Sequence, residues 1–191
     1  MSHDVAEGVE RETEIRAAGP ADAREFCRSW DPYVDEKVVT DRDFDYRIFE
    51  WDMLIHLSLT GEFDYRCYAA VAEGRLEGLL ALRREKILYI DFVSTAPWNY
   101  GRSGRLRRIG SGLIYFMIQA SREAGQGGAF NLFAVLDAEA YFEKIGMVPT
   151  GRFKYGLREY TLPAERAASF AEQFLPHVVA LPPGERRRKK S

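Results

Sequence analysis

The chain has 191 residues, enough for one domain with a hydrophobic core of ordinary size. Hydrophobic residues make up 46% of it and charged residues 29%, and the formal net charge is -2, so a nucleic-acid partner, which would favour a basic chain, is not expected. It contains two cysteines without a CxxC motif and three histidines without ligand spacing. This content argues against a disulfide framework, a metal site and a histidine-dependent nucleophile.

No apolar run reaches the roughly 18 to 20 residues that a membrane-spanning helix needs, and the acidic N-terminus is unlike a secretory signal. A cytoplasmic location without a membrane partner is therefore expected. Residues 1–12 and the basic segment 176–191 are predicted to be disordered tails around one domain, residues 13–175. The RRRKK run in the second tail is either a solvated tail or a contact for acidic partners.

The first half of the domain begins with a predicted short strand, EIRAAG, followed by a helix over ADAREFCRSW. A longer amphipathic helix is predicted over residues 43–60, ended by Gly61. Its apolar residues recur at spacings of three to four: Phe44, Ile48, Trp51, Ile55 and Leu59. Residues 65–95 then predict three strands, separated by Glu73-Gly74 and by the charged run 83–86.

The second half begins with a loop after Pro97 and a predicted helix over residues 107–124, stopped by the glycines at 125–128. AFNLFAV predicts a strand, and Asp137 is expected to cap a short helix, AEAYFEKIG. A strand pair over residues 148–162 and a helix over residues 164–175 complete the domain. Strands and helices mixed in this order, without an internal repeat, predict a single α+β domain.

An anion site is predicted where the loop meets the helix, at RRIGSG. A helix start leaves backbone N–H groups unpaired, and the positive end of the helix dipole favours negative charge there. Glycines let a phosphate approach the backbone, and arginines add charge. The P-loop, the dinucleotide fingerprint and GxSxG all fail on this stretch. The alternative is a solvated turn.

The motif R-x-x-G-x-G, here Arg107 to Gly112 after a strand that ends before a proline, resembles the acetyl-CoA motif of the GNAT superfamily of N-acetyltransferases. Downstream, DAEAYFEKIGM resembles that family's helix ending in F-Y-x-K-x-G-F, and the element order agrees over about residues 13–162. The resemblance implies a mixed, mostly antiparallel sheet that is flanked by helices and splayed at the acetyl-CoA site.

The same resemblance implies the function: acetyl-CoA as co-substrate, and direct transfer of its acetyl group to a small-molecule or peptide amine in a ternary complex. Pantetheine would lie along the preceding strand, and the pyrophosphate would bind backbone amides of the loop and helix start. The strand residues are Phe92, Val93, Ser94 and Thr95, and the pyrophosphate residues are Arg108, Ile109, Gly110, Ser111 and Gly112, with Arg107 at the first motif position.

Two departures from the family pattern bear on the chemistry. The loop PWNYGRSGRL is several residues longer than usual, and it either reaches the 3′-phosphate of CoA or is an adaptable surface loop. Phe142 stands where the family often has a tyrosine acid, and Tyr141 precedes it. One helical step turns a side chain by about 100°, so Tyr141 is either a packing residue or a displaced acid. A CoA-binding module without turnover is the rival function.

The acceptor side is read from two acidic positions. Asp91 lies within an apolar strand, where alternation would place it on one face with Tyr89, Val93 and Thr95. It is a candidate general base or substrate anchor, or else it forms a salt bridge to a neighbouring arginine. Glu50, Trp51 and Asp52 either form a wall of the acceptor pocket or are a core tryptophan beside two solvated acids. The oligomeric state is expected to be monomer or homodimer.

Overall fold

A single seven-stranded sheet runs through the protein, in the strand order β1-β2-β3-β4-β5-β7-β6. The computed structural model describes residues 13–30, 50–99, 108–134, 136–154 and 156–174. The strands are β1 Glu14–Ala17, β2 Tyr65–Ala72, β3 Arg75–Arg83, β4 Tyr89–Thr95, β5 Phe130–Ala134, β6 Val148–Lys154 and β7 Leu157–Leu162. Only β4 and β5 pair in parallel, and every other neighbouring pair is antiparallel. The α+β class with a mixed, mostly antiparallel sheet is confirmed.

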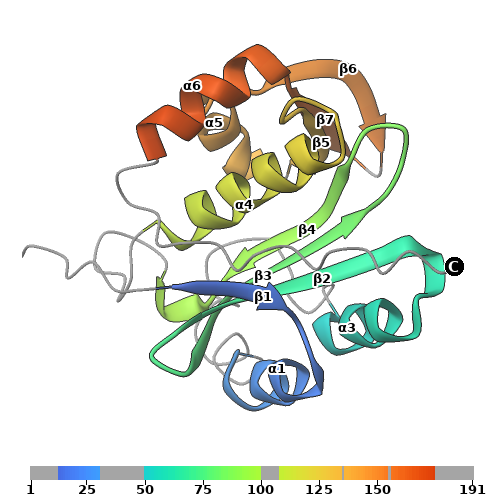
Figure 1. Ribbon diagram of the computed structural model, residues 1–191, viewed down its shortest axis with the longest axis vertical. Coiled ribbons are helices and arrows are strands. Elements are labelled where there is room, and N and C mark those ends of the chain that lie inside the picture. Colours follow the sequence, from blue (N-terminus) through green and yellow to red (C-terminus); the bar gives the residue numbers. More distant parts are fainter. Residues whose placement is uncertain (1–12, 31–49, 100–107, 135, 155, 175–191) are drawn as a thin grey trace, which may run out of the picture.

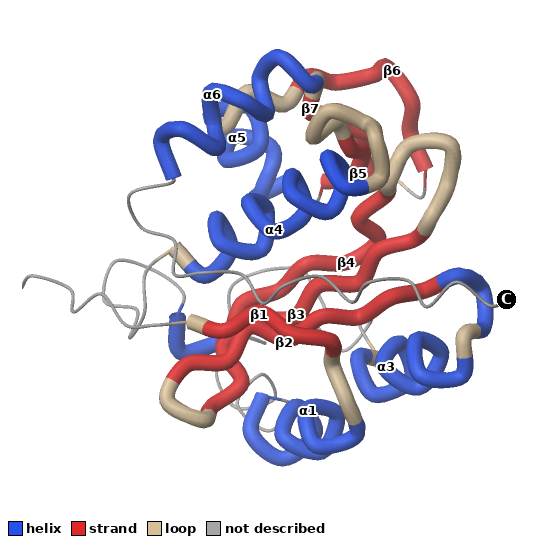
Figure 2. The backbone as a smooth tube through the Cα atoms, viewed as in Figure 1, coloured by secondary structure: helices blue, strands red, loops and turns tan. Residues whose placement is uncertain are grey.

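Helices cover both faces of this sheet (Figures 1 and 2). On one side lie α1 Pro20–Glu25, which continues into the π-helical turn η1 Phe26–Trp30, and α3 Trp51–Thr60. On the other side lie α4 Ile109–Glu123, α5 Leu136–Lys144 and α6 Ala164–Phe174. Two short 3-10 turns, η3 Glu62–Asp64 and η4 Pro97–Asn99, precede β2 and follow β4.

The helix boundaries correct the sequence prediction at two places. The predicted cap at Asp137 is wrong, because α5 already begins at Leu136, so residue 137 lies inside the first turn. The helix predicted over 43–60 begins at Trp51, since Glu50 before it has non-helical backbone angles (φ -70°, ψ 74°). Residues 43–49 lie outside the described residues, as do both predicted tails.

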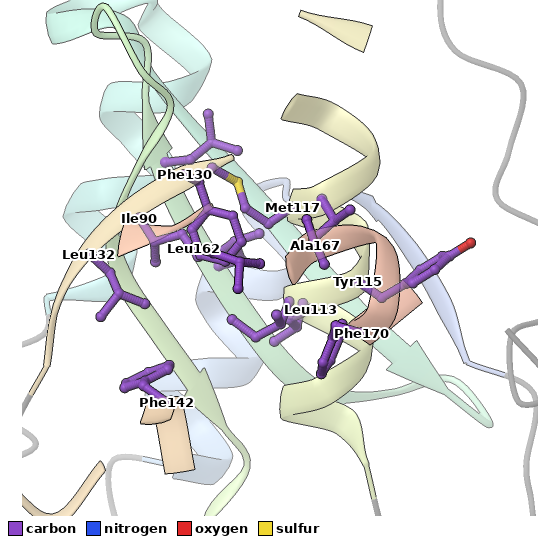
Figure 3. Close-up of a cluster of buried hydrophobic side chains, with 14 of the residues drawn as sticks. Ile90, Leu113, Tyr115, Met117, Phe130, Leu132, Phe142, Leu162, Ala167 and Phe170 are labelled. Carbon is purple, nitrogen blue, oxygen red and sulfur yellow. The ribbon is translucent and has the colours of Figure 1, made fainter. Parts of the chain in front are cut away.

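Two hydrophobic clusters hold the helices against the sheet. The α4 core lies between the sheet and α4, α5 and α6; it includes Ile90, Leu113, Leu132 and Phe142 (Figure 3). The α3 core lies between the other face and the helices α1 and α3, and Trp51 is among its largest side chains. Strand β3 is buried along almost its whole length because it contributes to both cores.

Gly78 sets how closely α4 approaches the sheet. A Cβ atom at this position of β3 would lie 2.8 Å from Cγ2 of Ile109 and 3.0 Å from Cδ1 of Leu113. The first distance is shorter than Cβ atoms show in proteins and the second is tighter than most, so a larger residue here would require Ile109 and Leu113 to shift. The position of the α4 N-terminus therefore depends on a residue 31 positions earlier in the chain.

We expect Gly78→Ala to lower the free energy of unfolding by about 1 to 3 kcal/mol, the usual cost of overpacking a core. Urea denaturation measures this change. The matched test is Gly78→Ala combined with Ile109→Ala, which removes the crowding atom. If the two substitutions destabilise in a simply additive way, the Gly78–Ile109 contact is not the cause.

Cys67 gives a chemical test of the α3 core. Its thiol on β2 is buried and donates to the carbonyl oxygen of Leu54 at 3.2 Å, and burial raises the pKa of Cys67 from 9.0 to about 12. The thiolate is the form that reacts with DTNB. Native protein at pH 8 should therefore react at the exposed Cys27 alone and release one equivalent of the thiolate product, whereas denatured protein should release two. The Cys27→Ser variant should not react with DTNB until it is unfolded. Rapid labelling of this variant in its native state would contradict the burial of Cys67.

The same pKa difference fixes the direction of one pH effect. The folded-state pKa of Cys67 lies above the unfolded value, so its contribution to the free energy of unfolding is fully present below about pH 9. That contribution is lost as the pH rises from about 9 to about 12. Cys67→Ala should weaken the alkaline limb of the stability curve.

Candidate functional site

The sheet is splayed between β4 and β5. These strands pair only at Tyr89–Asn131 and Ile90–Leu132, whereas β4 stays paired with β3 as far as Thr95 and β5 stays paired with β7 as far as Ala134. We call residues 91–95 of β4 and 133–134 of β5 the splayed segment. Within it the facing backbone groups of the two strands do not pair with each other, so they are available to amide groups of a ligand. The predicted splay is confirmed.

The start of α4 lies beside the far end of the splayed segment. A Cβ atom on Gly110 would lie 3.6 Å from Cγ2 of Thr95, so the first turn of the helix adjoins the end of β4. Arg108 precedes the helix in the left-handed conformation, at φ 70°, and the amide of Gly112 donates to its carbonyl oxygen at 2.8 Å. Among the described residues no side chain caps this helix start, which leaves its first amides to solvent or to a ligand. Arg107 lies outside the described residues.

Tyr141 reaches this helix start from α5. Its hydroxyl lies 3.0 Å from Oγ of Ser111, in the first turn of α4, and burial raises the pKa of Tyr141. Phe142, one residue later, is 5% exposed and belongs to the α4 core (Figure 3). The hydroxyl of the candidate acid thus lies at the α4 end of the splayed segment, and the residue at the family's tyrosine position is a core side chain.

Asp91 lies in a β-bulge at the start of the splayed segment. Ala81 pairs with Phe92 and Leu82 pairs with Ile90, which leaves Asp91 as the extra residue. The predicted alternation is therefore wrong beyond it: Val93 packs against the α4 core, whereas Asp91 bonds Arg83 on the opposite face. The bulge is the physical reason, because one inserted residue exchanges the two faces of a strand.

Arg83 holds Asp91 with two hydrogen bonds. Its Nη2 lies 2.8 Å from Oδ1, and its Nε donates to Oδ2. The guanidinium also pairs with Glu85 at 2.9 Å, and the Asp91 carboxylate raises the pKa of Arg83 further above its ordinary value. The salt bridge that the sequence left as an alternative is present, and it fixes the orientation of the carboxylate at the bulge.

A row of side chains crosses the sheet on the face opposite α4. Strand register aligns Tyr65, Arg83, Tyr89, Asn131 and Thr161, which we call the polar row. This row crosses β2, β3, β4, β5 and β7 at the point where the splay begins, so it borders the splayed segment.

Glu159 anchors the polar row from β7. Its carboxylate is 1% exposed and accepts hydrogen bonds from Tyr89 at 3.3 Å, Thr150 at 2.5 Å and Arg152 at 3.0 Å. Burial, and next the negative charge of Glu159, raise the pKa of Tyr89. The Arg83 guanidinium lies 5.6 Å from the centre of the Tyr89 ring. Sequence reasoning missed these residues, although an arginine and a glutamate inside apolar strands were a usable signal.

The remaining predicted residues lie along β4. Phe92 contacts Trp51 of α3, with ring centres 6.4 Å apart, and Ser94 is buried. Beyond Thr95, the chain is tied to Glu77 of β3: the side chains of Trp98 and Asn99 each donate to its carboxylate at 2.7 Å. Glu77 therefore fixes the direction in which the chain leaves β4.

Trp51 is a core residue and does not line an acceptor pocket, since it is 1% exposed within the α3 core. A shallow surface hollow of about 390 Å³, open to solvent, lies between α1, η1 and α3, and none of its lining residues belongs to the splayed segment. Its lining residues are Ala23, Arg24, Cys27, Arg28 and Asp52. Of the acidic pair suggested by the sequence, Asp52 alone borders a hollow.

The described residues contain no group of three histidine, cysteine, aspartate or glutamate side chains arranged to hold a metal ion. None of their helices combines the length and the apolar character that crossing a bilayer requires.

The fold resembles that of solved acetyltransferase structures. No family model matches the chain, and no curated protein matches it. The PaiA N-acetyltransferase of Thermoplasma acidophilum, solved with coenzyme A, is 12% identical; the alignment covers 80% of this chain and 99% of that one, with a TM-score of 0.59. A GNAT family acetyltransferase of Brucella melitensis, solved with acetyl-CoA, is 18% identical over 80% of this chain and 88% of that one, with a TM-score of 0.52.

A third similar structure is apo FdhC, a nucleotide-linked sugar GNAT. It is 9% identical, the alignment covers 86% of this chain and 94% of that one, and the TM-score is 0.62. At these identities the likeness concerns the fold. The protein has the GNAT fold, as the sequence predicted.

Proposed function

We propose that the protein is an acetyl-CoA-dependent N-acetyltransferase that moves an acetyl group to a primary amine in a ternary complex. The observation that carries the proposal is the divergence of β4 from β5 next to the uncapped start of α4. This combination offers unpaired strand amides to pantetheine and unpaired helix amides to a pyrophosphate. The PaiA and Brucella structures, which contain CoA and acetyl-CoA, support the choice of cofactor.

The direction of the cofactor follows from the position of α4. With the pyrophosphate at the amides of residues 108–112, the pantetheine arm runs along β4 from Thr95 back toward Asp91, about 13 Å at the usual strand rise. The thioester then lies near the bulge, where the strands begin to separate. A backbone N–H near Val93 is the proposed donor to the oxyanion of the tetrahedral intermediate.

In the proposed transfer, the amine nitrogen attacks the thioester carbon, an N–C bond forms, and the C–S bond breaks. The amine gives up one proton, and the departing thiolate takes one. We assign the first proton to Asp91, directly or through water, because this carboxylate lies at the bulge and Arg83 fixes its orientation. We assign the second to water, because the Tyr141 hydroxyl lies at the other end of the splayed segment, beside Ser111.

The test has two arms. Acetyl-CoA at 100 times its Kd should stabilise the protein by about 2.7 kcal/mol, which a thermal-shift measurement detects. A panel of primary amines should then produce amine-dependent release of free CoA thiol. Absence of stabilisation at high acetyl-CoA contradicts the proposal at its first step.

A CoA-binding module without turnover is the second candidate. It is favoured by Phe142, which is buried in the α4 core at the position of the family's tyrosine acid. Stabilisation by acetyl-CoA without CoA release across the amine panel would establish this alternative. The cytoplasmic location and the choice between monomer and homodimer stay predictions from the sequence.

A further inference from the structure

Asn131 carries the one unexplained polar atom of the polar row. Its Oδ1 is buried and has no hydrogen-bond partner among the described residues. Its neighbours are engaged: Tyr89 donates to Glu159, and Asp91 accepts from Arg83. A buried acceptor without a donor is costly, and an absent ligand or an ordered water is a usual explanation.

Asn131 also lies where the acceptor must arrive. It pairs with Tyr89, and only the pair Ile90–Leu132 follows before β4 and β5 separate. Asn131 therefore lies next to the proposed position of the thioester. On the α4 face this position is closed, because Ile90, Leu132 and Phe142 fill it with the α4 core (Figure 3). The polar-row face is therefore the side from which we expect an amine to approach the thioester.

We propose that Oδ1 of Asn131 accepts an N–H of the acceptor amine and thereby selects a primary amine; this inference rests on the proposed function. The carboxylate of Asp91 is bound by Arg83, and that of Glu159 is bound by Arg152. The group without a partner at this point is therefore the neutral amide oxygen of Asn131. A neutral acceptor favours the uncharged amine, which is the form with a lone pair for attack.

The selectivity follows from a count of hydrogens on nitrogen. An uncharged primary amine has two N–H groups: Asn131 accepts one, the second proton leaves to Asp91 during transfer, and the lone pair forms the N–C bond. A secondary amine has a single N–H and cannot satisfy both positions. The protein should therefore acetylate a primary amine in clear preference to its N-methyl derivative.

The experiment compares wild type with Asn131→Leu, which keeps the size of the side chain and removes the acceptor. The probes are ethylamine, putrescine, phenethylamine, N-methylphenethylamine and glycinamide, with release of CoA thiol as the readout. We expect the KM of the best amine to rise about tenfold or more in Asn131→Leu, with the KM for acetyl-CoA unchanged. Asn131→Asp, which retains an acceptor oxygen, should restore part of the amine affinity.

Thr161→Val is the matched control, because Thr161 lies in the same row on β7, one strand further from the splayed segment. It should leave both KM values unchanged. Equal changes in the two KM values of Asn131→Leu, or no change, would overturn the inference and leave the acetyltransferase proposal standing; an ordered water would then satisfy Oδ1.

A measurement of amine binding tests the role of Asn131 even if the protein does not transfer the acetyl group. Wild type saturated with CoA should gain a further rise in Tm on adding the amine, and Asn131→Leu should not. If acetyl-CoA stabilises the wild type but no amine adds to that effect or releases CoA, the acceptor role of Asn131 is wrong. If acetyl-CoA itself gives no stabilisation, the proposed function has failed at its first step, and the inference falls with it.

Discussion

Replacing Ser111 by glutamate is expected to weaken acetyl-CoA binding by about 100-fold or more. Ser111 lies in the first turn of α4, where the pyrophosphate is proposed to bind, and a carboxylate there would face a dianion at short range. Two unit charges 4 Å apart repel by about 4 kcal/mol at the effective dielectric of a protein surface. The measurement is the acetyl-CoA Kd by calorimetry, at two salt concentrations, because screening should reduce the loss.

The same substitution should not destabilise the protein without ligand. A glutamate in the first turn interacts favourably with the helix dipole, by about 0.3 to 1 kcal/mol. Ser111→Gln is the control, since it has a similar size, lacks the charge and also removes the bond to Tyr141. A comparable loss of affinity in both variants would show that the hydroxyl contact, and not charge at the helix start, governs binding.

Asp91→Asn is expected to lower kcat by about 100-fold or more, the usual effect of removing a general base. The acetyl-CoA Kd should stay unchanged, because the side chain lies at the thioester end of the cofactor. Loss of the charged partner of Arg83 should also reduce the free energy of unfolding by about 1 to 2 kcal/mol, as the pair is only partly exposed. Steady-state kinetics and urea denaturation separate the two effects.

Glu85→Gln is the matched control for this prediction. Glu85 binds the same guanidinium at 2.9 Å, but it lies outside the bulge and is about half exposed. It should therefore keep near wild-type kcat. If both variants lose activity in proportion to their stability, Asp91 has a structural role only, and the base must be sought elsewhere.

The sequence predicted most elements because their signals are local. The strand-like residues 65–83, divided by the Glu73-Gly74 turn, predicted β2 and β3, and RRIGSG followed by an apolar run predicted the start of α4 to within two residues. The prediction of a cap at Asp137 was wrong because it rested on the residue type alone, and the helix begins one residue earlier, at Leu136.

The contacts around Asp91 depend on tertiary structure. A bulge arises from the register between two strands, and a strand's own sequence does not reveal it, so the alternation beyond Asp91 was misread. The polar row likewise joins residues from β2 to β7 through strand register, and the bond from Tyr89 to Glu159 spans 70 positions of the chain.

The sequence by itself determined the α+β class, the order of the elements and the stretch that resembles an acetyl-CoA motif, because helix and strand periods and a glycine-rich helix start are properties of neighbouring residues. Only the tertiary structure decided the partner of Asp91, the burial of Phe142 and the unpaired oxygen of Asn131. These depend on which distant strands become neighbours and in which register, and that outcome is fixed by the packing of the whole domain.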